Sequence, residues 1–402
     1  MSGPDFLSTE YLRDPYAMQR VMRDEYPLYF HAPTNSYVMS RYEDVARAFR
    51  DPAFSNQVYV WQLKDVYPDR TIIQMDGKEH AAYRNIVAPS LRETELRAHW
   101  LRTIEDNARS LIDVFRNRGE VDLVGEFTSC YPINVTVDLL GLPQSDRGRF
   151  QRWYQALVDQ ITNLQQDPAI VERGRLARRQ LCEYLIPVLD ERRAAVRNDL
   201  LSAMVTAEVG GRPLSDTEIQ AFVALLLVGG GETLDNGLGL LFKNLVQRPE
   251  VLAAVRSNRS LCVAAFAETL RFTPPVHMVM RMTVEDVEVS GGTIPKNSFV
   301  VCMIAAANRD ERRWRDPDTF DIQRRDNDLD VSRSFTAAAA HLAFGSGRHF
   351  CAGAALAKIE VEVAVNQLLD AMCDVRFTGD VPPDRNYFIR GPRTLPLHFT
   401  VT

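Results

Sequence analysis

The sequence predicts a single, mainly α-helical domain with a small β region, spanning residues 1–402. Three observations support this fold class. Apolar residues recur at three- and four-residue spacing in six long stretches, which is the period of an α-helix. Runs typical of strands are few and short. Proline and glycine are spread evenly along the chain, so no linker marks a domain boundary.

The longest helical stretch covers residues 215–247. It begins with the capping box Ser215-Asp216-Thr217-Glu218 and ends before Pro249. At ~1.5 Å per residue, a helix of about 33 residues is ~50 Å long, enough to cross a whole domain. The other predicted helices are 94–117, 145–163, 170–197, 259–271 and 352–373. Strands are predicted at 36–40, in a hairpin and buried strand over 287–304, and at 394–402.

Composition excludes several classes of protein. The net charge of −6 gives no basic field for nucleic acid. The N-terminus lacks the pattern of a signal peptide, and the longest apolar run is far shorter than the ~20 residues of a membrane span. The six cysteines are scattered without a CxxC pair, which suggests neither a zinc site nor a disulfide framework. We therefore expect a cytoplasmic monomer that binds neither nucleic acid nor membrane.

One cysteine has unusual surroundings. In "HLAFGSGRHFCAGAALAKIE" (341–360), a glycine-containing loop leads to Cys351, and an alanine-rich helix follows. The helix dipole and free N–H groups stabilise a thiolate at such a position. Small neighbours also let a flat cofactor approach the backbone. A lone cysteine is usually an inert thiol. The spacing of the residues around Cys351 indicates a functional cysteine instead.

The stretch "LLLVGGGETLDNG" (225–237) places three glycines in the middle of the longest helix. Each interior glycine costs about 1 kcal/mol relative to alanine. Two explanations are open. The glycines allow close packing of helices, or they leave space for a ligand beside Glu232 and Thr233, whose side chains suit acid–base chemistry.

The pattern F-G-x-G-x-H-x-C-x-G is complete in the cysteine loop, and it resembles the haem-binding loop of the cytochrome P450 family in its bacterial form. Further family landmarks follow in order along nearly the whole chain. The resemblance implies haem b, with Cys351 as the axial ligand of the iron. The other haem contacts that it implies are His80, Arg84, Gly229, Arg281, His341, Phe344, His349 and Gly353.

Two further features belong to the resemblance. Glu268 and Arg271 match the family's ExxR pair, but Thr319 stands where an arginine often bridges to that pair, so either Arg324 compensates or the brace has two members. Glu232 and Thr233 match the acid and hydroxyl on the helix that crosses the haem opposite the thiolate. Thr233 is expected to hydrogen-bond the activated oxygen and Glu232 to help deliver protons, with a local widening of the helix.

The resemblance implies a haem-thiolate monooxygenase that inserts one oxygen atom from O₂ into a mid-sized hydrophobic or aromatic molecule of specialised metabolism. Oxidative coupling or rearrangement without oxygen insertion is an alternative, and a non-catalytic haem carrier or gas sensor is another. The substrate-pocket candidates are mostly apolar, as small-molecule sites are. They are Val58, Trp61, Leu226, Val276, Met278, Val279 and Phe388.

No flavin- or nicotinamide-binding segment follows the cysteine loop. Electrons are therefore expected from a ferredoxin and its ferredoxin reductase. An acidic ferredoxin would be steered by a local basic patch. The candidate residues of that patch are Arg92, Arg313 and Lys358, with Arg348, Arg312 and Arg315 nearby in sequence.

Overall fold

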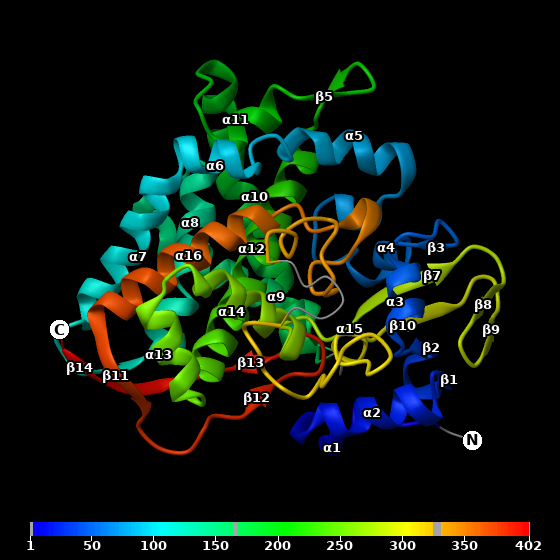
Figure 1. Cartoon of the computed structure of the whole chain (residues 1–402). Helices are drawn as coiled ribbons and strands as arrows, with labels where there is room; N and C mark the ends of the chain where they lie inside the picture. The colour runs from blue at the N-terminus through cyan, green and yellow to red at the C-terminus, as the bar shows by residue number, and fades with distance from the viewer. Residues whose placement is uncertain (1–2, 164–166, 325–330, 402) are drawn as a thin grey trace.

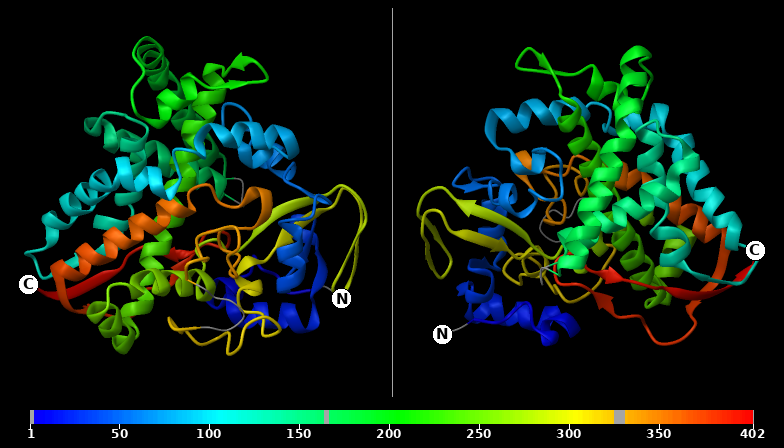
Figure 2. Two further views of the ribbon diagram at one scale, coloured as in Figure 1. Left: turned by 45° about the horizontal axis from the view of Figure 1, so that its top comes forward. Right: turned by 180° about the vertical axis from the view of Figure 1, so that it is seen from behind.

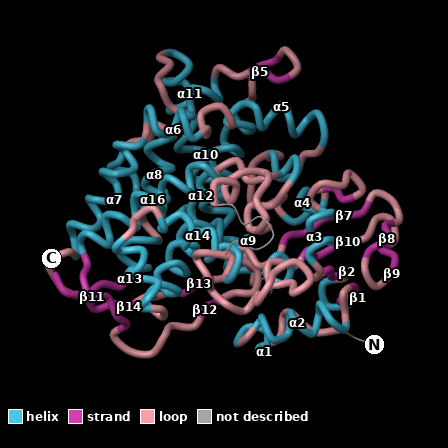
Figure 3. Tube along the Cα trace, in the orientation of Figure 1, coloured by secondary structure: helices cyan, strands magenta, loops and turns pink. Residues whose placement is uncertain are grey.

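The computed structural model describes residues 3–163, 167–324 and 331–401. Helices make up most of the fold, as predicted, and a five-stranded sheet lies to one side of them (Figures 1 and 3). Among the described residues, no helix combines the length and apolar character that crossing a membrane requires.

The central element is α12 (Asp216–Val246), which packs against α8 (Tyr131–Leu139), α9 (Arg147–Ile161), α10 (Pro168–Ala194) and α14 (Leu261–Phe272). Its predicted capping box is confirmed. The Ser215 hydroxyl accepts from the Glu218 N–H at 3.2 Å, and the Glu218 carboxylate accepts from the Ser215 N–H at 2.7 Å. Most of α12 is buried, so tertiary packing rather than helix propensity holds its glycine-rich middle in place.

The predicted helix 94–117 is two helices that meet at Trp100, and the sequence analysis did not name several shorter ones. The remaining α-helices are α1 (Thr9–Arg13), α2 (Pro15–Glu25), α3 (Tyr42–Ala48), α4 (Val58–Gln62), α5 (Gly77–Val87), α6 (Glu93–His99), α7 (Leu101–Phe115), α11 (Leu200–Val205), α13 (Pro249–Ser257), α15 (Ile304–Ala307) and α16 (Ala354–Ala371). Short 3₁₀ turns occur at Ala32–Thr34, Ile72–Gln74, Gln144–Asp146 and Gly347–His349, and a π turn at Val124–Thr128.

The strands confirm the three predicted regions. The main sheet has the order β1 (Leu28–His31), β2 (Ser36–Met39), β10 (Phe299–Cys302), β7 (Val279–Thr283), β3 (Phe54–Ser55), and only its β2–β10 pair is parallel. A second sheet has the order β11 (Met372–Phe377), β14 (Pro396–Val401), β4 (Glu120–Asp122). The two-stranded pairs are β5 (Glu208–Val209) with β6 (Arg212–Pro213), β8 (Val287–Val289) with β9 (Gly292–Ile294), and β12 (Asp384–Arg385) with β13 (Gly391–Pro392).

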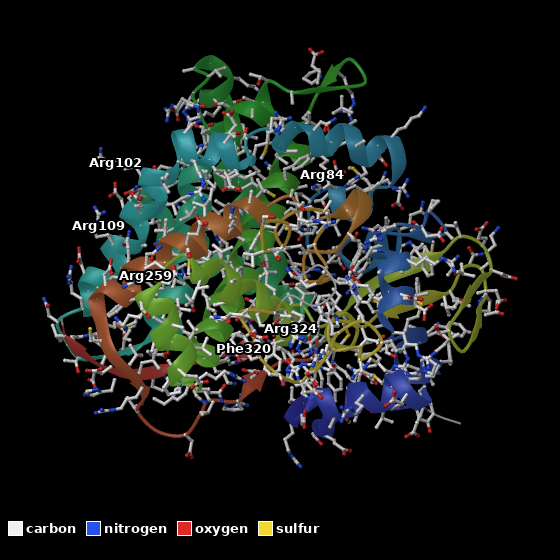
Figure 4. All side chains as sticks on the ribbon, in the orientation of Figure 1. Arg84, Arg102, Arg109, Arg259, Phe320 and Arg324 are labelled. Atoms are coloured by element: carbon white, nitrogen blue, oxygen red, sulfur yellow. The ribbon has the colours of Figure 1, made fainter. Side chains whose placement is uncertain are left out.

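A buried ion cluster joins α14 to the segment that follows α15. The Glu268 carboxylate accepts two hydrogen bonds from Arg271, both of 2.7 Å, and a third of 3.3 Å from Arg324. Both guanidinium groups also donate to the Thr319 carbonyl, at 2.9 and 2.8 Å. Arg324 is therefore the third member of the cluster, in place of the arginine that the sequence lacks at Thr319. Figure 4 labels it beside Phe320.

Candidate active site

A cavity of about 350 Å³ lies between α12 and the segment from Phe344 to Glu360. In both views of Figure 2 this segment, drawn in orange, runs between α5 and the long central helix. The cavity brings together most of the residues that the sequence singled out, from four separate parts of the chain. The predicted residues in its wall are His80, Arg84, Leu226, Gly229, Thr233, Val279, Arg281, Phe344, His349, Cys351 and Gly353.

The cysteine loop needs its glycines for conformational reasons. Gly345 and Gly347 have φ angles of +69° and +66°, a region that residues with a side chain rarely adopt. A Cβ on Gly347 would also lie 2.7 Å from the Phe49 carbonyl oxygen. The loop closes when the Cys351 N–H donates to the Phe344 carbonyl at 2.9 Å. The Cys351 side chain is consequently held open to the cavity, just before the N-terminus of α16.

Two histidines stack at one edge of the cavity. The rings of His80 and His349 lie 4.0 Å apart, and His349 is held by Asp76 at 3.2 Å and by Asn56 at 3.2 Å. Burial, followed by the charges of His349 and Arg84, lowers the pKa of His80 to about 4. His80 is therefore neutral at pH 7 and suited to hydrogen bonding. The sequence did not single out Asp76 or Asn56, because neither belongs to a recognisable local pattern.

Arg84 and Arg281 present cationic groups to the cavity. Within the described parts of the chain, neither guanidinium has a carboxylate partner; Arg281 donates to the Met280 carbonyl at 2.8 Å and lies over the Phe49 ring. Figure 4 labels Arg84 between α5 and the orange loop. Two unpaired cations at the edge of an otherwise apolar cavity suit a flat cofactor that carries carboxylates, and they fit haem with its two propionates.

His341 is fully buried but is not in the cavity wall. Its ring lies 5.9 Å from the ring of Phe344, which does line the cavity. Burial lowers the pKa of His341 to about 4, so its ring is neutral at pH 7.

The three glycines of α12 have different surroundings. A Cβ on Gly229 would meet nothing within 4 Å, and this residue lines the cavity. A Cβ on Gly230 would lie 2.9 Å from the Thr136 hydroxyl, and one on Gly231 would lie 2.4 Å from the Ile133 side chain. Gly229 therefore leaves space for a ligand, whereas Gly230 and Gly231 allow close packing of helices.

The predicted local widening of α12 is wrong, because the helix stays α-helical from Asp216 to Val246. The Thr233 hydroxyl lines the cavity and donates to the Gly229 carbonyl at 2.9 Å. A backbone carbonyl on the cavity side thus gains a side-chain donor without a change of helix type.

Glu232 is not in the cavity wall. Its carboxylate accepts from the Tyr154 hydroxyl at 2.9 Å and from the Asn236 amide at 3.0 Å, which holds it on the α9 side of α12. Burial raises its pKa. A second acid, Asp235, accepts from Thr128 at 2.6 Å, and burial raises its pKa to about 7. The sequence analysis missed this second acid, since an aspartate three positions from a glutamate is common on any helix.

The other predicted pocket residues lie elsewhere. Trp61 is 62% exposed and packs against Phe299, while Val276 forms a bridge with Ile389. Val58 is in the main core, and Met278 and Phe388 belong to a separate apolar cluster near the N-terminal helices. Besides the predicted Leu226 and Val279, the apolar part of the wall is formed by Ile72, Ile73, Leu91, Leu139, Leu200, Leu225, Leu234 and Leu356.

Tyr59 is a polar group in this apolar wall. Its hydroxyl oxygen accepts from the Met280 N–H at 3.0 Å, and Arg281 lies beside it. Within the described parts of the chain, the hydroxyl hydrogen has no acceptor. Tyr59 can therefore donate a hydrogen bond to a molecule in the cavity.

Known proteins resemble this chain over almost its full length. The family model described as Cytochrome P450 matches residues 18–386. Pulcherriminic acid synthase of Bacillus subtilis is 38% identical, over 98% of this chain and 97% of that protein. Cyclomarin C epoxidase CymV of Salinispora arenicola is 32% identical, over 94% of each.

Solved structures agree. The structure of cytochrome P450 CYP109Q5 from Chondromyces apiculatus superposes with a TM-score of 0.87 at 32% identity, covering 99% of this chain and 98% of that one. The match extends to the helical fold with its small sheets, and the family's cofactor is a haem whose iron carries an axial cysteine thiolate. The chain therefore belongs to the cytochrome P450 family and is a haem-thiolate monooxygenase.

Proposed function

We propose that Cys351 is the axial thiolate of haem b and that the enzyme inserts one oxygen atom from O₂ into a mid-sized hydrophobic molecule. One observation carries the proposal. A single cavity has Cys351 in one wall and Gly229 and Thr233 in the wall formed by α12. When bound, haem with a thiolate ligand supplies the activation of dioxygen. Residues of this chain hold the cofactor, leave room for the substrate and handle protons.

Those side chains have separate tasks. Arg84 and Arg281 neutralise the propionates, and neutral His80 adds a hydrogen bond at the same edge. Gly229 leaves the face opposite Cys351 open, so that dioxygen and a C–H or C=C group can meet there. The Thr233 hydroxyl can accept a hydrogen bond from water while it donates to the Gly229 carbonyl.

Glu232 supplies protons from behind the helix. In the structure its carboxylate is tied to Tyr154 and Asn236, away from the cavity. Delivery therefore requires a rotation of the side chain or a bridging water. Its raised pKa suits this task, because a group that titrates closer to neutral pH releases and regains protons readily.

The substrate is proposed to be a neutral, largely apolar product of specialised metabolism that carries a hydrogen-bond acceptor. The leucine- and isoleucine-rich wall supports the apolar part, and the free donor of Tyr59 supports the acceptor. The names of the two curated relatives, a synthase and an epoxidase, support the metabolic class.

The electron donor is proposed to be a ferredoxin, itself reduced by a ferredoxin reductase, that docks near the cysteine loop. The six predicted basic residues do not form one patch. Lys358 pairs with Glu93 of α6 at 3.0 Å, whereas Arg312 pairs with Asp24 of α2, on the opposite side of Figure 1. Exposed Arg92 and Arg348 are the better candidates for docking.

Reversing the charge of those candidates tests the docking face. Arg92→Glu and Arg348→Glu should slow reduction by ferredoxin most strongly at low salt, where the Debye length is longest. Arg315→Glu, the same charge change on the distant segment, should leave the rate at the wild-type level. Stopped-flow reduction measures all three, and equal rates would place the docking face elsewhere.

Replacing the thiolate tests the central assignment. Cys351→Ala should lose the Soret band of the reduced carbon monoxide complex that is characteristic of a thiolate ligand. Thr233→Ala, in the facing wall, should keep that band but form less product per electron consumed, because more oxygen leaves as peroxide. A Cys351→Ala protein that retained the band would overturn the proposal.

A further inference from the structure

The cavity wall that carries Cys351 contains a buried acid to which the proposed reaction assigns no task. Glu360 lies nine positions after Cys351 on α16, lines the cavity, and is only 3% exposed. Among the residues that the structure describes, its Oε1 atom has no hydrogen-bond partner. A buried carboxyl group without a partner is costly in a folded protein, so its presence in a cavity wall calls for an explanation.

The helix itself aims this residue at the cavity. Gly353, Leu356, Ala357 and Glu360 all line it, and their three- and four-residue spacing places them on one face of α16. The nearest recorded hydrogen bond, from the Tyr131 hydroxyl at 3.2 Å, goes to the backbone carbonyl of Glu360 and leaves the carboxyl group alone. The Oε1 atom is therefore available to what occupies the cavity.

No charged group compensates Glu360. The titratable groups that share the cavity wall with it are Tyr59, His80, Arg84, Arg281, His349 and Cys351. The helices packed against α16 carry Glu93, Glu95, Arg97 and His99 on α6, Arg102, Glu105, Asp106, Arg109 and Asp113 on α7, and Cys262, Glu268 and Arg271 on α14. Tyr131 and Asp138 lie on α8, and α16 itself also carries Lys358, Glu362 and Asp370. None of them contributes to its pKa, which burial alone raises well above the usual range. Glu362, two positions on, faces outward and pairs with Arg97.

We propose that Glu360 is a proton-binding site coupled to reduction of the haem, an inference that rests on the proposed function. One electron from the redox partner adds a negative charge at the cavity. In a poorly polarisable interior that charge strengthens proton binding by a nearby carboxylate. The balance is one electron to the iron and one proton from water to the Glu360 carboxylate, with no other bond made or broken.

The coupling acts in both directions, so it predicts whether the reduction potential rises or falls with pH. Where Glu360 is ionised, its negative charge opposes reduction, so the reduction potential falls as the pH rises through the pKa of the carboxyl group. Below that pKa the carboxyl group is neutral and has no such effect. Because burial raises the pKa of Glu360 well above that of an ordinary glutamate, the pH dependence begins at a higher pH than an exposed glutamate would give.

Glu360→Gln tests this coupling, because an amide has the same shape and no charge at any pH. Spectroelectrochemical titration of the haem-loaded protein, from acidic to alkaline pH, should give matching potentials at the acidic end, where the carboxyl group is protonated. The potential of the wild type should then fall below that of the variant. Glu362→Gln, on the outer face of the same helix, should behave as the wild type. Potentials of wild type and Glu360→Gln that coincide at every pH would overturn the inference.

Two further measurements distinguish a failure of the proposed coupling from a failure of the proposed function. The infrared difference spectrum of reduction, recorded in the pH range where the potential changes, should show the carbonyl band of a newly protonated carboxyl group, and this band should be missing in Glu360→Gln. If the variant does not take up haem, a pH-independent potential in the wild type alone refutes the coupling. A wild type without the thiolate Soret band would instead mean that the proposed function fails.

Discussion

The ion cluster on α14 and the middle of α12 are both buried and both contain acids, but their partners differ. Glu268 accepts from two guanidinium groups and from the Asp321 N–H at 2.9 Å. Within the described ranges, the Glu232 carboxylate accepts hydrogen bonds from two neutral groups, the Tyr154 hydroxyl and the Asn236 amide. The Glu268 carboxylate is fixed by cationic partners, whereas the Glu232 carboxylate has neutral hydrogen-bond donors that water can replace.

This difference separates a structural role from a chemical one. A buried charge that is fully paired holds its surroundings in one geometry, and removing one partner leaves an uncompensated charge. Buried acids with neutral partners have raised pKa values, as Glu232 and Asp235 do, and such groups cluster at functional sites. The α14 cluster holds the fold that presents the cysteine loop, and α12 carries groups that can move protons.

The largest effect is expected from breaking the α14 cluster. Arg271→Ala should lower the free energy of unfolding by about 3–5 kcal/mol, since it removes two of the hydrogen bonds to the buried Glu268 carboxylate and leaves its charge only partly compensated by Arg324. Arg116→Ala, which removes an exposed pair with Asp113, should cost about 0–1 kcal/mol. Urea unfolding followed by circular dichroism measures both. A similar small cost for the two variants would contradict a structural role for the cluster.

A pH-dependent effect is expected from Asp235. Burial raises its pKa from 3.8 to about 7, so the folded protein keeps this proton to a higher pH than the unfolded chain. Its contribution to stability is complete below 3.8 and is lost as the pH rises to about 7. Asp235→Asn stays neutral, so its stability relative to the wild type should rise over that range, by at most about 4 kcal/mol.

Urea unfolding of wild type and Asp235→Asn at several pH values checks this prediction. A difference between the two proteins that does not change with pH would show that Asp235 is ionised like an exposed aspartate. It would also weaken the contrast between the α14 cluster and α12.

The smallest effects should come from a pair of glycines two positions apart. Gly231→Ala places a Cβ 2.4 Å from Ile133 and 2.6 Å from the Tyr154 ring, and this overpacking should cost about 1–3 kcal/mol. Gly229→Ala meets nothing within 4 Å and should stabilise the helix by about 1 kcal/mol. The gain should come with weaker ligand binding, because the added methyl group narrows the cavity. Thermal unfolding measures the change in stability, and Soret titrations measure ligand binding. Equal changes in stability for the two variants would contradict the different surroundings of Gly229 and Gly231.

The sequence by itself determined the features that depend on neighbours along the chain. The capping box begins α12, the glycines with positive φ shape the cysteine loop, and the spacing of that loop indicated the family. Helical periodicity located the long helices and missed several short ones, since a short helix owes its stability to packing. His80, Arg84, Arg281 and Cys351 were selected by local patterns, and the structure brings all four to one cavity.

Only the tertiary structure decided which partner each side chain meets. It pairs Arg324 with Glu268, directs Glu232 away from the cavity and exposes Trp61. It also leaves the Oε1 atom of Glu360 without a hydrogen-bond partner among the described residues. It also leaves open space beside Gly229 and places the Ile133 and Tyr154 side chains close to Gly231, although both glycines belong to the same helix. The physical reason is that burial and pairing depend on residues distant in sequence, such as Tyr154 on α9, and no local pattern records them.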